Sequence, residues 1–157
     1  MKDADATSTP AAASRLAPDE ALLARFVALA RAGQRPATSH FGGDADFKAN
    51  GLRRYARYRD LGVAEATGGL VQAHVIRMVP PCPPEANAEH LHETVFQIMY
   101  VLQGWIKVQL EGRDAEVMRA GSCWTQPPSI RHRVLDYSGD LEVLEILLPA
   151  DFRTVNT

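Results

Sequence analysis

The feature that most constrains the fold is a series of short apolar or alternating runs, separated by turn residues, that extends from about residue 69 to residue 148. Glycine, proline and aspartate interrupt these runs too often for helices of ordinary length. Strands so close together in sequence pair in an antiparallel manner. We therefore expect an all-β fold, a sandwich or a barrel, with strands over residues 69–79, 94–102, 105–110, 115–119, 122–126, 131–137 and 141–148.

The region before these strands has a different pattern. Residues 1–16 are small and polar without periodicity, which predicts a disordered arm. Further along, Pro18 suits a first helical turn, and Gly33 followed by Pro36 suits the end of a helix. We predict an amphipathic helix over about 18–33 that covers either its own sheet or a partner subunit. Its apolar stripe consists of Leu22, Leu23, Phe26, Val27 and Leu29.

Length and composition indicate an ordinary globular domain. The chain has 157 residues, of which 46% are hydrophobic and 23% charged, enough to bury a core without a structural metal. Cys82 and Cys123 are too few for a disulfide framework. The longest uncharged run, Thr94 to Ile106, is shorter than the roughly 20 apolar residues that span a bilayer. We expect a cytoplasmic protein that does not enter a membrane.

One basic segment needs a separate interpretation. Residues 51–60, "GLRRYARYRD", place four arginines among two tyrosines, a composition that nucleic-acid-binding surfaces also have. The net charge of −2 and the lack of a recognised nucleic-acid-binding motif argue against that function. We interpret the segment as a solvated surface and expect no nucleic-acid partner.

Three histidines are candidates for a metal site. His90 and His92 share one face of a predicted strand, where they bind a metal together or are merely polar residues on an exposed face. His132 opens another predicted strand. Gln97 lies in a strand that is apolar on both faces, which predicts a buried strand and a buried amide in need of a partner such as a metal. Three neutral imidazoles suit a transition metal better than calcium or magnesium.

The spacing around the first two histidines resembles the first motif of the cupins, a family of small antiparallel β-barrels. That motif has a glycine, five residues, His-x-His, three or four residues, a glutamate, six residues and a glycine. His90, His92 and Gly104 match it. Gln97 stands in the glutamate position, and Pro84 in that of the leading glycine.

The second cupin motif is similar to the sequence around the third histidine. It has a glycine, five residues, Pro-x-Gly, two residues, a histidine, three residues and an asparagine. Gly121, Pro127 and His132 match it, while Ser129 replaces the glycine and Asp136 replaces the asparagine. The joint spacing of the two motifs is too specific for chance to be a good explanation.

The resemblance covers roughly residues 70 to 148. It implies an antiparallel, double-stranded jelly-roll barrel over residues 61–157, preceded by the arm and by a helical and irregular extension over residues 17–60. It also implies one divalent transition metal ion, either iron, zinc, nickel, manganese or copper. Its ligands are then His90, His92, Gln97 and His132.

Several functions are compatible with this resemblance, because cupins host many chemistries. The first hypothesis is a metal-dependent, dioxygenase-like enzyme that acts on a small organic substrate. The alternatives are a non-catalytic metal- or ligand-binding protein, such as a sensor or pathway accessory protein, and a sugar isomerase or epimerase. A neutral amide at Gln97 leaves the charge of a metal less compensated, which favours anionic ligands.

The sequence assigns no catalytic residue. The possible general bases beyond the ligands are Glu145 and Asp136, and His74 is interpreted as structural or pocket-lining. We also expect a homodimer, because barrels of this size often pair their edge strands.

Overall fold

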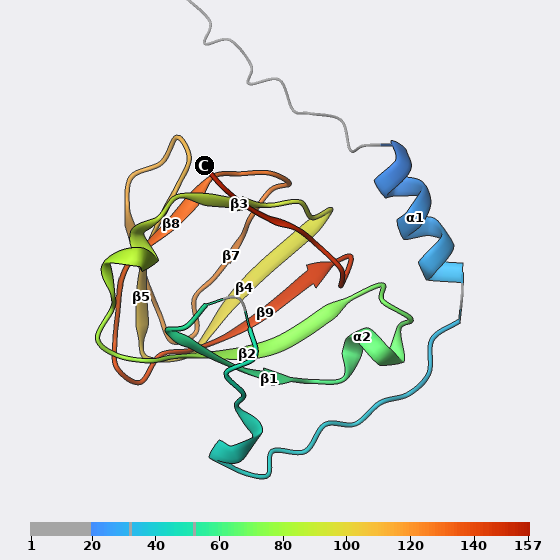
Figure 1. The fold of residues 1–157 in the computed structure, drawn as a ribbon, viewed down its shortest axis with the longest axis horizontal. Helices are drawn as coiled ribbons and strands as arrows, with labels where there is room; N and C mark the ends of the chain where they lie inside the picture. The colour runs from blue at the N-terminus through green and yellow to red at the C-terminus, as the bar shows by residue number, and fades with distance from the viewer. Residues whose placement is uncertain (1–19, 32, 52) are drawn as a thin grey trace, which may run out of the picture.

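Two antiparallel five-stranded sheets face each other (Figure 1). The computed structural model describes residues 20–31, 33–51 and 53–157, so the predicted arm over 1–16 lies outside the described residues. The first sheet has the order β1-β2-β9-β4-β7 and the second the order β10-β3-β8-β5-β6. The predicted all-β jelly-roll fold is thus confirmed. The strands are β1 Ala56–Asp60, β2 Gln72–Met78, β3 His90–His92, β4 Phe96–Gln103, β5 Trp105–Leu110, β6 Glu116–Arg119, β7 Cys123–Thr125, β8 His132–Tyr137, β9 Glu142–Leu148 and β10 Thr154–Asn156.

Every predicted run contains an observed strand. The structure adds β1 and β10 outside those runs, together with β3, which carries the two histidines expected on one strand face. β3 and β10 have three residues each, too few for an alternating pattern to be seen in the sequence. The inner faces of the two sheets form the core, whose largest fully buried side chains include Leu141, Leu147 and Gln97.

The helices are few and peripheral. They are α1 Glu20–Arg31, the short α2 Val63–Ala66 and the 3₁₀ turns η1 Asp44–Asp46 and η2 Pro84–Asn87. α1 lies beside the barrel rather than over a sheet (Figure 1), and none of its residues is buried. Its predicted apolar stripe therefore adds no buried side chain to the core of this chain. Within the described residues, no helix has the length and hydrophobicity that crossing a bilayer requires.

Strand β4 differs from its prediction on one face. It is central, since β9 and β7 flank it, and Gln97, Met99 and Val101 are buried on its inner side. The expectation that its other face is also buried is wrong, because Phe96 and Tyr100 are 41% and 42% exposed. No second layer of the described chain covers this outer face.

The basic segment is not the solvated surface that its composition predicted. β1 pairs with β2 along its whole length, and an isolated bridge between Lys48 and Tyr58 joins the preceding segment to it. Ala56 is 1% exposed and belongs to the core. The structure thus places a strand of the first sheet inside the predicted extension over 17–60. The division of the chain into arm, extension and barrel stays a prediction.

Candidate metal centre

The second sheet brings the three predicted histidines together. β3 lies between β10 and β8, so that His90 is directly opposite His132 and His92 is opposite Thr154. One ring nitrogen of each histidine lies within 4.8 Å of the others. The ring centroids of His90 and His132 are 4.2 Å apart. This spacing is close enough for three imidazoles to bind one ion.

Hydrogen bonds fix which nitrogen of each ring faces the cluster. Nδ1 of His90 is 3.0 Å from the carbonyl oxygen of Ala88, and Nδ1 of His132 is 3.1 Å from that of Ile130. Because a carbonyl oxygen only accepts, both Nδ1 atoms carry the proton and donate it, which leaves Nε2 with a free lone pair. Nδ1 of His92 has a side-chain partner instead, the Thr154 hydroxyl at 2.9 Å, which can donate or accept. Such outer partners orient metal-binding histidines.

The environment keeps these imidazoles neutral. Burial lowers the pKa of His90 to about 3 and that of His92 to about 4, and it also lowers the pKa of His132. The positive charge of Arg53 lowers all three further. A neutral imidazole is the form that binds a metal, so the cluster is ready to bind one without first losing protons at neutral pH.

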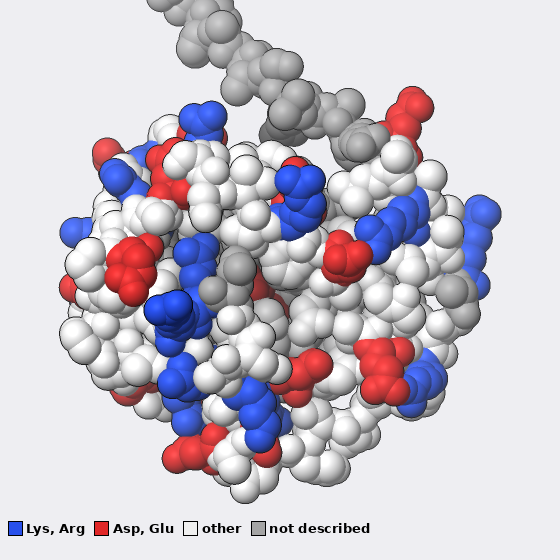
Figure 2. Space-filling view, viewed as in Figure 1, with Lys and Arg blue, Asp and Glu red and all other residues white. Residues whose placement is uncertain are grey.

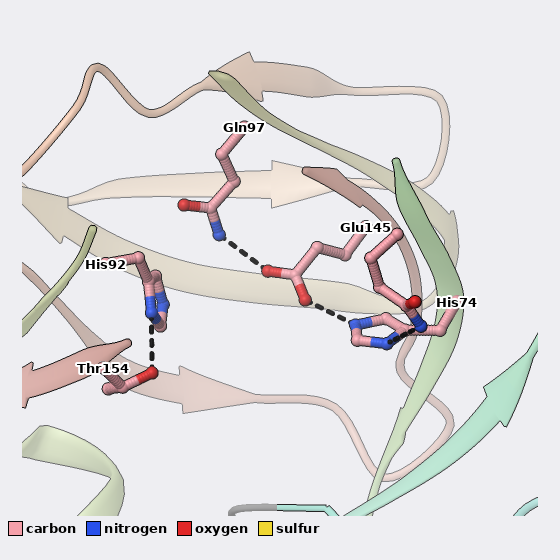
Figure 3. Close-up of polar contacts among 6 residues, drawn as sticks. His74, His92, Gln97, Glu145 and Thr154 are labelled. Carbon is pink, nitrogen blue, oxygen red and sulfur yellow. Dashed lines mark hydrogen bonds and ion pairs between the residues drawn. The ribbon is translucent and has the colours of Figure 1, made fainter. Parts of the chain in front are cut away.

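The facing wall, on the first sheet, carries a different network (Figure 3). Glu145 lies between two partners: it accepts a hydrogen bond from Nε2 of Gln97 at 2.7 Å, and its other oxygen is 2.5 Å from Nε2 of His74. His74 and Glu145 are directly opposite each other on β2 and β9. Nδ1 of His74 in turn lies 3.4 Å from the Gln72 amide. All of these side chains come from the inner face of the first sheet.

Glu145 stays ionised although it is buried. Burial alone raises its pKa, but the hydrogen bond and the charge of His74, with the Gln97 amide, lower it overall. Glu145 was already a candidate base from the sequence, and the structure places it in this network. The other candidate, Asp136, is exposed on β8 and bonds the amide of Tyr137.

The two walls enclose a cavity of about 650 Å³. The three histidines, Gln97 and Glu145 line it, as does His74, in agreement with its prediction as pocket-lining. Apolar side chains from both sheets complete its walls, among them Met99, Val108 and Val143. Residues of the N-terminal extension also line the cavity, including Arg53 and Tyr58.

The structure explains two departures from the cupin motifs. Ser129, where the motif has glycine, adopts a φ of 58°, the left-handed conformation that glycine takes without strain. Pro84 begins the 3₁₀ turn η2, a position that suits the fixed φ of proline. By contrast, the matching Gly104 has a φ of 71°, and a Cβ there would come within 2.2 Å of the Ser138 hydroxyl.

Sequence reasoning missed three residues of this site. Thr154 lies on the three-residue strand β10, for which the sequence gives no periodic signal. Arg53 and Tyr58 belong to the basic segment interpreted as surface. The alternation of tyrosine and arginine in "YARYR" is the one signal that could have indicated a strand with an inner face there.

Comparison with known proteins agrees with this architecture. Residues 80–147 match the model of the cupin domain family. The barrel is a cupin domain. Among curated protein sequences no match was found.

Solved structures with similar folds include KdgF from Halomonas sp., with a TM-score of 0.55 and 23% sequence identity over 71% of this chain and 94% of that chain. Oxalate decarboxylase from Bacillus subtilis gives a TM-score of 0.57 and 17% identity over 82% of this chain. A mutant salicylate 1,2-dioxygenase from Pseudoaminobacter salicylatoxidans, in complex with gentisate, gives a TM-score of 0.54 and 12% sequence identity over 87% of this chain. The aligned region covers only 34% and 35% of the latter two chains. These similarities concern the cupin fold.

Proposed function

We propose that this cupin is a metal-dependent, dioxygenase-like enzyme that acts on a small organic substrate. His90, His92 and His132 hold the metal in this proposal. The observation that carries it is the set of three imidazoles, buried at His90 and His132 and partly buried at His92, whose Nδ1 atoms are all engaged, so that the Nε2 atoms are the ones available at the wall of a cavity.

The donor set fits a divalent transition metal. Imidazole suits iron, zinc, nickel and copper, and three protein ligands leave open coordination positions. A bound redox-active ion would supply a site at which substrate and dioxygen are held next to each other. Salicylate 1,2-dioxygenase, which has the same fold, is a dioxygenase by name.

Gln97 remains our predicted fourth ligand. Its amide nitrogen donates to Glu145, which leaves the carbonyl oxygen as the atom that can bind a metal. Gln97 is 2% exposed and lines the same cavity as the three histidines, where a bound metal would give that oxygen a partner. Glu145 therefore orients the Gln97 amide. It also places a negative charge next to the site, in the way that the glutamate of the cupin motif would at position 97.

The cavity supports an enzyme more than a non-catalytic module. A small or wholly apolar pocket would favour a sensor or an accessory protein. A volume of about 650 Å³ and a lining that includes Glu145, His74 and Arg53 leave room and polar partners for a substrate. A sugar isomerase would need an acid and a base on opposite sides of the substrate, whereas Glu145 and His74 are bonded to each other on one wall.

Oxygen uptake tests the proposal. Protein loaded with iron(II) is expected to consume oxygen in the presence of a small diketone, thiol or phenolic acid. The His132→Ala variant is expected to lose this activity, whereas Lys107→Ala, at an exposed residue that does not line the cavity, keeps it. His40→Ala, at a histidine that lines the cavity but lies outside the cluster, is expected to keep the metal. A native protein that retains no redox-active metal, or that consumes no oxygen with any of these compounds, would contradict the proposal.

We also propose that the protein forms a homodimer and is cytoplasmic. Support for the dimer comes from the exposed outer face of β4, where Phe96, Tyr100 and Leu102 are each more than two-fifths exposed. β7, at the edge of the same sheet, lies beside them. Sedimentation at micromolar concentration is expected to give a dimer, and a monomer would contradict this part.

A further inference from the structure

Arg53 is a partly buried arginine whose positive charge has no anionic partner among the described residues. Its Nη2 atom is buried and makes no hydrogen bond to any residue that the structure describes, although Arg53 lines the cavity. Its Nη1 atom donates to the hydroxyl of Tyr55, at 3.1 Å, and the guanidinium lies 6.0 Å from the centre of that ring. Leaving a charged group unpaired in a buried position is costly. The arrangement therefore suits a ligand that brings the missing anion.

The carboxylates nearest in the sequence are engaged elsewhere. Asp46 accepts a hydrogen bond from the backbone of Gly42, and Asp60 accepts one from that of Gly62. Glu145, the buried carboxylate of the cavity, is held by Gln97. Within the described part of the chain, no ion pair to Arg53 is formed.

Other arginines of the same segment do have partners or face solvent. Arg57 donates to backbone carbonyls, Arg59 lies over the Phe41 ring at 5.1 Å, and Arg54 is exposed. Figure 2 shows Lys and Arg side chains gathered over the region where Figure 1 draws the chain from η1 to β1. Arg53 differs from these neighbours because it combines a place on the cavity wall with an unpaired buried nitrogen.

The segment that carries Arg53 is fitted closely to the barrel. At Gly51 the backbone passes over the Tyr58 ring, so that an added Cβ would come within 2.0 Å of a ring carbon. Tyr58 itself packs against His74, with ring centroids 5.3 Å apart. The segment that carries Arg53 thus packs, through Tyr58, against His74, a side chain that lines the cavity.

A second donor on the wall points to the same ligand chemistry. Trp124 lines the cavity, as well as a smaller pocket beside it, and its indole Nε1 is buried without a partner among the described residues. Indole and guanidinium groups only donate. A ligand that reaches both must therefore supply acceptor atoms, such as carboxylate oxygens.

We propose that Arg53 recognises the carboxylate of a small organic acid, which would then be the substrate class of this site. The inference rests on the proposed metal-dependent function. The carboxylate accepts hydrogen bonds from the guanidinium, whose planar arrangement of donors matches it, while another oxygen of the substrate faces the three histidines.

A matched pair of probes tests this assignment. 2,4-Dioxopentanoate and pentane-2,4-dione both present a diketone to a metal, but only the first has a carboxylate. We expect iron(II)-loaded protein, kept free of oxygen, to bind the carboxylate probe at least about tenfold more tightly in calorimetric titrations. Arg53→Gln is expected to reduce this preference to about one, and Arg54→Gln, at the exposed neighbour, to leave it unchanged. If the glutamine variant does not fold, Arg53→Met repeats the comparison.

Metal analysis of the same samples separates the two proposals. A preference lost only in the Arg53 variant, at unchanged metal content, supports the carboxylate site. Equal affinity of the native protein for both probes overturns it, and so does a preference that survives in Arg53→Gln, since the carboxylate then binds at the metal. If the native protein holds no metal, the proposed function fails, while binding of 2,4-dioxopentanoate that still depends on Arg53 supports the site.

Discussion

The two walls of the cavity hold their polar side chains in different ways. On the β3–β8 wall, His90 and His132 donate to backbone carbonyls. On the β2–β9 wall, Glu145 is held by two other side chains, His74 and Gln97. The first wall presents neutral nitrogen atoms, and the second presents a buried negative charge.

This difference separates two tasks. Backbone partners cannot be removed by mutation, so the orientation of two histidines is fixed by the fold itself. The facing network depends on three side chains and can vary without loss of the histidine cluster. We infer that the three histidines of the β3–β8 wall are sufficient to hold the metal, and that the β2–β9 wall contributes stability and orients Gln97, the predicted fourth ligand.

The largest effect is expected for Glu145→Ala. This change leaves the buried amide of Gln97 and the ring of His74 without their shared partner, and we expect it to lower the free energy of unfolding by about 3 kcal/mol. Metal content is expected to stay at the native level. Urea unfolding and elemental analysis measure the two properties.

The neighbouring Glu142→Ala is a matched control on the same strand. Glu142 pairs with Arg77 at 2.8 Å near the surface, where an ion pair contributes at most about 1 kcal/mol. A loss of metal in Glu145→Ala but not in Glu142→Ala would show that the two walls do not act separately.

The stability of the metal-free protein is expected to fall in two stages as the pH is lowered. Unfolded histidines bind protons below about pH 6.5, whereas burial holds the pKa of His90 at about 3 and that of His92 at about 4. The unfolded state therefore binds more protons, and the free energy of unfolding falls as the pH drops below about 6.5, by about 1.4 kcal/mol for each of these two histidines at pH 5.5. The lowered pKa of Glu145 adds a further loss only below about pH 4.5.

Urea unfolding at pH 7.5, 6.0, 5.0 and 4.0 follows both stages. Replacing His90 by glutamine is expected to reduce the first stage and leave the second. Constant stability between pH 7.5 and pH 5 would contradict the neutral, buried state of the histidines.

A smaller effect is expected for Thr154→Val. Thr154 is the side-chain partner of Nδ1 in His92, and its loss frees the ring to change its orientation. Removal of such an outer partner typically weakens metal binding about tenfold or more. The affinity can be measured by competition with a chelator, with Thr157→Val, on the exposed C-terminal residue, as the control. Unchanged affinity would mean that Phe152, which packs against the His92 ring, orients it alone.

The smallest effect is expected for Ser129→Gly. Glycine removes the strain of the left-handed conformation, which is partly offset by the greater freedom of glycine in the unfolded chain, so we expect a gain of roughly 0.5 kcal/mol. A rise in the thermal midpoint measures it. Ser122→Gly, at a serine without positive φ, is expected to give no gain.

The fold was predictable because most strands carry a local signal. The runs around Met99 and Val143 alternate or are continuously apolar, and turn residues bound them. Strands that are short and close together in sequence are expected to pair in an antiparallel manner. On β8, strict alternation would place Asp136 on the same face as His132, but a register shift opposite Lys107 and Val108 leaves Asp136 exposed and Tyr137 buried. A bulge of this kind depends on the partner strand and has no signature of its own in the sequence.

The site was predictable only in part. The fixed spacing around His90 and His132 indicated a shared site, because both histidines lie at ends of paired strands. The place of Arg53 was not predictable, since a basic segment looks the same in sequence whether it is solvated or paired with β2. The pairing of β1 with β2, which depends on tertiary structure, places this segment against the cavity rather than in solvent.

Elemental analysis of protein purified without added metal tests the central claim most directly. The account predicts about one divalent transition metal ion per chain in the native protein and in His40→Ala, and its loss in His132→Ala. A native protein without a transition metal, or a His132→Ala variant that keeps the full native content, would contradict the assignment of the three histidines as a metal centre.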